Sequence, residues 1–459
     1  MHQSLPTTAM AINRQRSVLR VAGKRRIMQL IPLLVVFYSV FLLSPEVEFS
    51  ALGVNFPGYR VALLVVLVPA LWSSMRGRTA PMQSMDVAVA IIGFWTILSF
   101  TMNYGFGVGI VRGAGVTIDT VVPYFVVRTC IRSLDDLRYF LILVLPAMAF
   151  AGIILLAESV SGRPLLSVAY ASVFGNMDLY SSGENVGALI IQGDTRMGLL
   201  RAFGPFPHPI LAGIMMIGFL PLYYFSGLRS WPLLGGIFFA LTGIFGLSSA
   251  AFLALMITVG AIVIYHIKAY FPKISWWSIS ALMTLLVWAM HMASKNGIIY
   301  VLARLTLTPH TAEHRIHTWR WGSLTVEKNP WFGIAYSQWE REAWMGESVD
   351  AHFLLMAMRH GLVVPIMMLA AIFYGMIRLG LIIPFLSPKD RAFAIGINMF
   401  IFCYFIVGQT VNYFGSSNVF FMSSIAFLAS AVSWGSAQMQ IGRRQKMPRY
   451  SSEIRQYLN

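Results

Sequence analysis

The stretch from Tyr139 to Val160, YFLILVLPAMAFAGIILLAESV, decides the fold class, because it is apolar over 22 residues with one charged side chain, Glu158. A helix of that length crosses a hydrocarbon core of about 30 Å. Similar runs recur along the whole chain of 459 residues, and only 11% of its residues are charged, against about a quarter in soluble domains. The sequence therefore predicts an all-α integral membrane protein and excludes an ordinary globular enzyme.

We expect about twelve transmembrane helices in a single membrane domain over residues 27–437, between basic tails at 1–26 and 438–459. The predicted spans are 27–43, 58–75, 84–101, 108–129, 139–160, 207–226, 232–248, 250–267, 276–293, 352–378, 392–410 and 418–437.

Two long loops, at about 161–206 and 294–351, fall on the outer side of this arrangement. Long ordered loops in a compact protein are usually functional. Within the second loop, residues 310–327 have the spacing of a helix, which Asn329-Pro330 and Gly333 would end.

The distribution of Lys and Arg favours a cytosolic location for both tails. Six of these residues precede the first predicted span and five follow the last, and the tails and inner loops together hold 22 of the 34. Basic residues mark the cytoplasmic side of membrane proteins, and the tails are expected to rest on anionic lipid headgroups. The net charge of +16 does not indicate nucleic acid, because no soluble module presents it.

Several ionisable residues of the outer side lie within a turn or two of a span, where charge is costly and marks functional candidates. Arg112 opens the fourth span, with Asp119 seven residues further along the same helical face. Local pairing of these two, or extension to the lipid headgroups, is the alternative to a functional role. Arg201 and Arg315 stand in dense polar and aromatic segments, and their guanidinium forks suit a phosphate diester or pyrophosphate.

His352 begins a predicted span directly after Asp350-Ala351. A neutral imidazole at the membrane surface accepts a proton near pH 7, and Asp350 is expected to fix its tautomer. The alternative is a histidine that only caps the helix at the interface.

Metal and cofactor chemistry is not expected. His310 to His314 fits the H-x-x-E-H pattern of some zinc peptidases, but the sequence offers no third ligand. Cys130 and Cys403 are isolated and have neither disulfide-framework nor metal-ligand spacing.

Three segments resemble the motifs of the O-antigen ligase and polymerase superfamily. Residues 201–213, RAFGPFPHPILAG, resemble its Arg-x-x-Gly-x-x-x-x-Pro element. The segment from Arg315 to Asn329-Pro330-Trp331-Phe332-Gly333 is similar to its outer-loop helix and Asn-Pro-x-x-Gly turn, and residues 350–355, DAHFLL, are similar to its histidine element.

The resemblance implies a metal-independent membrane glycosyltransferase of the GT-C type, in the bacterial inner membrane with its site facing the periplasm. Such enzymes take glycan from an undecaprenyl-pyrophosphate-linked donor. Arg201 and Arg315 would then hold the pyrophosphate, and His352 would orient or deprotonate the acceptor hydroxyl. The further substrate-binding candidates are Arg196, His208, His317, Trp319, Arg320, Asp350, Arg359 and Arg112.

Within this superfamily, the His-Pro-Ile sequence ending at Ile210 looks more like exopolysaccharide polymerases than ligases, which usually have Asn there and after the catalytic histidine, where this chain has Phe353. A polymerase that joins lipid-linked repeat units is therefore expected, with the acceptor glycan, membrane lipids, and a chain-length regulator and export machinery as partners. A ligase that transfers glycan to lipid A-core is the alternative. A flippase or other transporter is less expected, because internal repeats and broken midplane helices are not evident.

Overall fold

The computed structural model describes residues 26–51, 54–77, 79–174, 195–271, 273–294 and 309–446. In chain order the helices are the first helix Arg26–Leu42, α2 Gly58–Met75, α3 Ser84–Tyr104, α4 Phe106–Cys130, α5 Leu134–Ser161, α6 Leu165–Phe174, α8 Pro209–Phe225, α9 Trp231–Leu241, the 3-10 helix η1 Thr242–Gly246, α10 Ser249–Tyr270, α11 Trp276–Ala293, α13 Pro309–Lys328, α14 His352–His360, α15 Val363–Ile382, the 3-10 helix η2 Ile383–Phe385, α16 Pro388–Val407 and α17 Ser416–Lys446. The strands form two antiparallel hairpins, β1 Glu48–Ala51 with β2 Val54–Pro57 and β3 Thr195–Arg196 with β4 Leu199–Leu200.

The prediction of an all-α membrane protein is confirmed. In the described part of the chain, eight helices are long and apolar enough to cross a membrane, as expected of a multi-pass protein: α2, α3, α4, α5, α10, α15 with η2, α16 and α17. The other four predicted spans fall on shorter apolar helical segments, and the full count of twelve stays a prediction. The helix expected at 310–327 is confirmed as α13.

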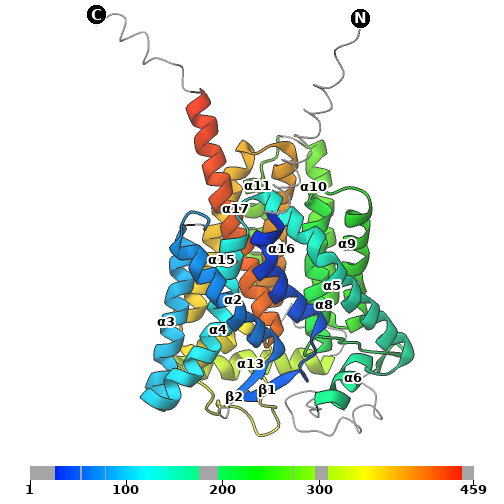
Figure 1. The fold of residues 1–459 in the computed structure, drawn as a ribbon. Coiled ribbons are helices and arrows are strands. Elements are labelled where there is room, and N and C mark those ends of the chain that lie inside the picture. The colour runs from blue at the N-terminus through cyan, green and yellow to red at the C-terminus, as the bar shows by residue number, and fades with distance from the viewer. Residues whose placement is uncertain are drawn as a thin grey trace, which may run out of the picture.

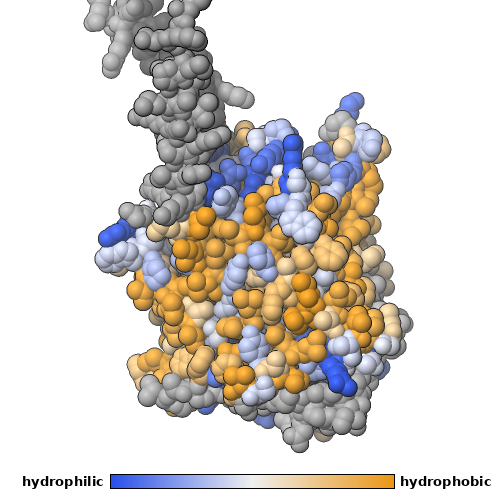
Figure 2. Space-filling view, turned by 45° about the vertical axis from the view of Figure 1, so that its right-hand side comes forward, coloured by the Kyte–Doolittle hydropathy of each residue, from blue (hydrophilic) through white to orange (hydrophobic). Residues whose placement is uncertain are grey.

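The helices stand side by side in one bundle, and α13 lies across one end of it, where the β1–β2 hairpin is also found (Figure 1). The far end of α17 projects from the opposite end. Figure 2 shows a broad band of hydrophobic residues around the middle of the face in view, with hydrophilic residues gathered above it. This distribution fits a bundle whose middle is surrounded by lipid.

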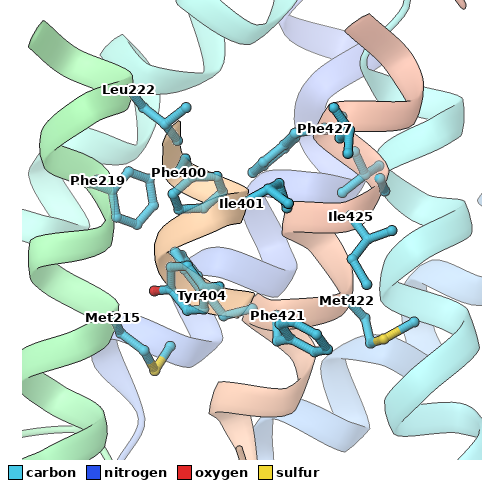
Figure 3. Packing of buried hydrophobic residues seen from close by; sticks show 14 of the residues in the cluster. Met215, Phe219, Leu222, Phe400, Ile401, Tyr404, Phe421, Met422, Ile425 and Phe427 are labelled. Atoms are coloured by element: carbon cyan, nitrogen blue, oxygen red, sulfur yellow. The ribbon is translucent and has the colours of Figure 1, made fainter. Parts of the chain in front are cut away.

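The centre of the bundle is α17, because 89% of an 18-residue apolar window within Ser416–Gln440 is buried inside the protein. Aromatic side chains of α8 and α16 pack against it (Figure 3). The Tyr404 hydroxyl of α16 donates to the Ile214 carbonyl of α8 at 2.9 Å, and Gly218 leaves the room that the tyrosine ring occupies. A buried hydroxyl needs such a partner, since leaving it unmatched costs about 1–3 kcal/mol.

The predicted span at 352–378 is wrong in one respect, because it is two helices. Gly361 ends α14 with φ +75° and ψ 179°, a conformation almost restricted to glycine. The turn after α13 occupies the break, since the Leu362 amide donates to the Pro330 carbonyl at 2.8 Å and a Cβ on Gly361 would lie 2.0 Å from the Trp331 carbonyl oxygen. The long loop after α13 is thereby fastened to the start of α15.

Gly361→Ala is expected to lower the free energy of unfolding by at least about 2 kcal/mol, because the added methyl meets both the strained backbone and a carbonyl oxygen. Denaturant unfolding of the detergent-solubilised protein measures the loss. Gly115→Ala is the matched control, since a Cβ at Gly115 of α4 has open space around it. Equal stability of the two variants would show that the break does not depend on Gly361.

Candidate functional site

The turn between α16 and α17, residues 408–415, is where predicted motifs meet. The His352 amide at the start of α14 donates to the Gly408 carbonyl at 2.8 Å. Trp319 of α13 donates from its indole Nε1 to the Gln409 carbonyl at 2.9 Å. The histidine element and the outer-loop helix are therefore held against the same turn.

The arginine motif reaches this turn from the other side. A Cβ built on Gly415 would lie 3.7 Å from Cγ of Pro207, which is ordinary contact distance. His208 then caps α8, its Nδ1 accepting a hydrogen bond from the Ile210 amide at 3.1 Å. Segments about 100 and 200 residues apart in sequence are thus brought to one end of the bundle, the end that α13 covers (Figure 1).

Glu158, in the last turn of α5, fixes the arginine motif in place. Its side chain is fully buried and accepts four backbone hydrogen bonds. The donors to Oε2 are the amides of Gly204 at 2.8 Å and Phe203 at 3.3 Å, and the donors to Oε1 are the amides of Leu165 at 3.0 Å and Leu166 at 3.1 Å. A buried carboxylate is tolerated where amides satisfy it in this way. Glu158 was not among the predicted site residues, although an acid near the end of an apolar run was a signal for it.

Arg315 of α13 is the most unusual charge of the site. Its side chain is 5% exposed, and Nε makes no hydrogen bond to the part of the chain that the structure describes. Burial lowers the pKa of the Arg315 guanidinium, with Asp350 opposing and Arg196 reinforcing the shift. Arg196 of β3 donates from Nη1 to the Leu247 carbonyl at 3.1 Å, and the buried Arg201 directly follows β4. Basic groups from the two long loops therefore lie close to one another.

His352 is fully buried, and its two ring nitrogens have different surroundings. Nδ1 lies 3.2 Å from Oδ1 of Asn412 and 3.4 Å from the Tyr413 amide nitrogen. Nε2 is buried without a hydrogen-bond partner among the described residues. Burial lowers the pKa of His352 to about 4, Asn412 opposes the shift and Arg359 adds to it. The imidazole is therefore neutral at pH 7.

The expected role of Asp350 is wrong. Asn412, from the turn after α16, occupies the position beside Nδ1 of His352, whereas Asp350 acts electrostatically on Arg315. The reason is that His352 begins α14 and points into the bundle, so that its ring meets Tyr413 and Phe421 at centroid distances of 5.0 Å each. Asp350 belongs to the extended segment before the helix.

The predicted local pairing of Arg112 with Asp119 is also wrong. Asp119 is bound by Arg60 of α2, whose Nε donates to Oδ1 at 2.9 Å. Arg112 instead lies over the ring of Tyr104, with 4.6 Å between its Cζ and the ring centroid. A separation of seven residues puts Arg112 and Asp119 on one face of α4. On that face, however, Asp119 meets α2, whereas Arg112 meets the end of α3.

The remaining candidates of α13 and α14 are distributed over the same end of the bundle. The His317 ring packs edge-on against Trp344 at 5.1 Å, and Arg320 is exposed. Arg359 lies over the ring of Tyr336, with 4.9 Å from its Cζ to the centroid. Arg359 and Arg112 thus belong to a group apart from Arg315.

No known family's sequence profile matches this chain, and no curated protein matches it either. The likeness to the O-antigen ligase and polymerase superfamily therefore depends on the motifs quoted above.

Glu158→Gln is expected to lower the free energy of unfolding by about 2–5 kcal/mol, because a neutral amide has one acceptor oxygen for four amide donors and leaves some of them unsatisfied. Denaturant unfolding in detergent measures the change. Glu340→Gln is the control, since its side chain is half exposed and pairs only with Lys328. A Glu158→Gln variant as stable as this control would contradict the anchoring role.

Proposed function

We propose that the protein is a membrane glycosyltransferase that uses a glycan linked to undecaprenyl pyrophosphate, and that it acts as a polysaccharide polymerase. One observation carries the proposal: Arg315 is a buried cation without an ion-pair partner among the described residues, in a basic group that meets the same turn as a neutral, buried His352. A buried unpaired charge costs several kcal/mol. Such a group at one end of a membrane bundle suits an anionic ligand.

The arrangement supports a direct transfer of the glycan. The bond between the anomeric carbon and the pyrophosphate oxygen breaks, and the leaving pyrophosphate takes the electron pair. Arg315, Arg201 and Arg196 stabilise that charge, each charge-assisted hydrogen bond contributing about 1.5–3 kcal/mol. The acceptor hydroxyl forms the new glycosidic bond and gives its proton to Nε2 of His352. Asn412 holds the imidazole by Nδ1.

The membrane setting of the proposal follows from charge. Twelve spans with cytosolic tails put α13 and the two long loops on the periplasmic side of the bacterial inner membrane. A lipid-linked donor would reach Arg315 from the surrounding bilayer, and the polymer would leave towards export machinery and a chain-length regulator. The fold would then be of the GT-C type.

The product formed by purified protein from a lipid-linked repeat unit tests the proposal. Longer chains on the carrier are expected of a polymerase. Glycosylated lipid A-core would make the protein a ligase with the same chemistry. An unaltered donor moved across the bilayer would overturn glycosyl transfer altogether.

Arg315→Lys is expected to lower the rate of polymer formation at least about tenfold, because an ammonium keeps the charge and loses the two-pronged hydrogen bonding of the guanidinium. Arg201→Lys should have a similar effect. Initial rates with a lipid-linked repeat unit measure it. Arg163→Lys is the matched control, since Arg163 is an exposed arginine of the first long loop. Near-normal polymer from both site variants would remove the pyrophosphate assignment.

The pH dependence of transfer tests His352 as the base. Its pKa of about 4 means that the neutral form is complete above about pH 5 and is lost as the pH falls through 4. The rate should therefore be flat from pH 8 to about 5 and fall below that. His352→Ala should insert in the membrane and lose activity at every pH. Full activity of this variant would leave the histidine a structural role only.

A further inference from the structure

A second group of arginines surrounds a pair of tyrosines at the same end of the bundle. The Tyr336 amide donates to the Tyr104 hydroxyl at 3.0 Å, which joins the outer loop to the end of α3. Arg112 lies over the Tyr104 ring at 4.6 Å and Arg359 lies over the Tyr336 ring at 4.9 Å. The two guanidinium groups therefore flank one tyrosine pair, although α4 and α14 carry them.

This group has an excess of positive charge. Among the described residues, neither Arg112 nor Arg359 forms an ion pair or a side-chain hydrogen bond, and each lies over an aromatic ring. Asp119, a nearby carboxylate, is already bound by Arg60. Arg60 itself is an electrostatic neighbour of Tyr336. The positive charges of Arg112 and Arg359 are therefore not balanced by a carboxylate among the described residues.

The two guanidinium groups differ in exposure. Arg112 is exposed and Tyr336 is 48% exposed, whereas Arg359 is only partly exposed. An arginine with one face on an aromatic ring keeps its N–H edge free for a planar or tetrahedral anion. Phosphate is the group that such an edge binds best, through two parallel hydrogen bonds.

The helix α14 connects this group with the candidate site, because it carries both Arg359 and His352. Arg359 follows His352 by seven residues, which puts the two on one helical face about 10 Å apart along the axis. Arg359 is also an electrostatic neighbour of His352. Arg315 instead has Asp350 and Arg196 as its electrostatic neighbours. The imidazole therefore has one basic group near the start of α14 and another at its end.

We propose that Arg112 and Arg359 form a second phosphate site, which holds the carrier pyrophosphate of the acceptor while Arg315 and its neighbours hold that of the donor. The inference rests on the proposed function and deepens it. A polymerase joins two glycans that are both carried on pyrophosphate lipids, and so has use for two such sites. Transfer to an acceptor without a carrier has use for one.

A comparison of two acceptors tests the second site. One repeat unit is presented on polyprenyl pyrophosphate and the same glycan on a neutral alkyl chain, and the donor has its terminal hydroxyl blocked. The wild-type protein should show a KM at least about tenfold lower for the pyrophosphate acceptor. The double variant Arg112→Gln with Arg359→Gln should bring the two KM values within about twofold of each other. Arg163→Gln should keep the wild-type difference.

The possible failures are distinguishable. Equal KM values for both acceptors in the wild type would overturn the second site and leave the glycosyltransferase proposal standing. If no donor is used at all, the proposed function fails, and binding of unglycosylated polyprenyl pyrophosphate in nanodiscs of zwitterionic lipid decides the site alone. Two molecules per chain, reduced to one by the double variant, support it. One molecule in both proteins, or equal displacement by phosphatidylglycerol, overturns it.

Discussion

The cost of burying charge among apolar helices is the constraint on which the rest of this structure depends. Three buried ionisable groups offset this cost with ion pairs or hydrogen bonds. Arg128 is bound by Asp86, with 2.8 Å from its Nε to Oδ1, Arg138 lies 2.8 Å from both Asp135 and Asp390, and Glu158 accepts four amides. Arg315 is the contrast, because among the described residues it is buried without such a partner. The paired groups hold the helices, and the unpaired one favours a ligand.

The turn at 408–415 brings together segments that are far apart in the sequence. Its carbonyls receive the His352 amide and the Trp319 indole, its Asn412 contacts the imidazole, and its last glycine lies near Pro207. The helix α17, which follows this turn, is buried over most of its apolar length, so the turn is joined directly to the packed core of the bundle. Catalytic geometry requires such a support, since small displacements of reacting groups cost large factors in rate.

Apolar run length and local spacing were enough to predict the all-α membrane fold and the bounds of several helices. The helices α2 and α11 begin and end where the sequence indicated, and α13 was expected from its spacing. The errors concern contacts between distant segments. Asn412, and not Asp350, lies beside Nδ1 of His352, although 60 residues separate the two in sequence. Arg60 of the neighbouring helix α2, and not Arg112, binds Asp119. Periodicity describes the face of one helix, and it does not say which neighbour that face meets.

The break at Gly361 shows why local sequence was least informative near the candidate site. Glycine is common in membrane helices, so its presence in the run after His352 gave no reason to divide the span. The turn at 330–333 occupies the space at the division, and α14 ends there before α15 begins. A short helix with His352 at its start and Arg359 near its end can face two basic groups at once. A continuous span would have carried Arg359 on into the membrane, away from Tyr336.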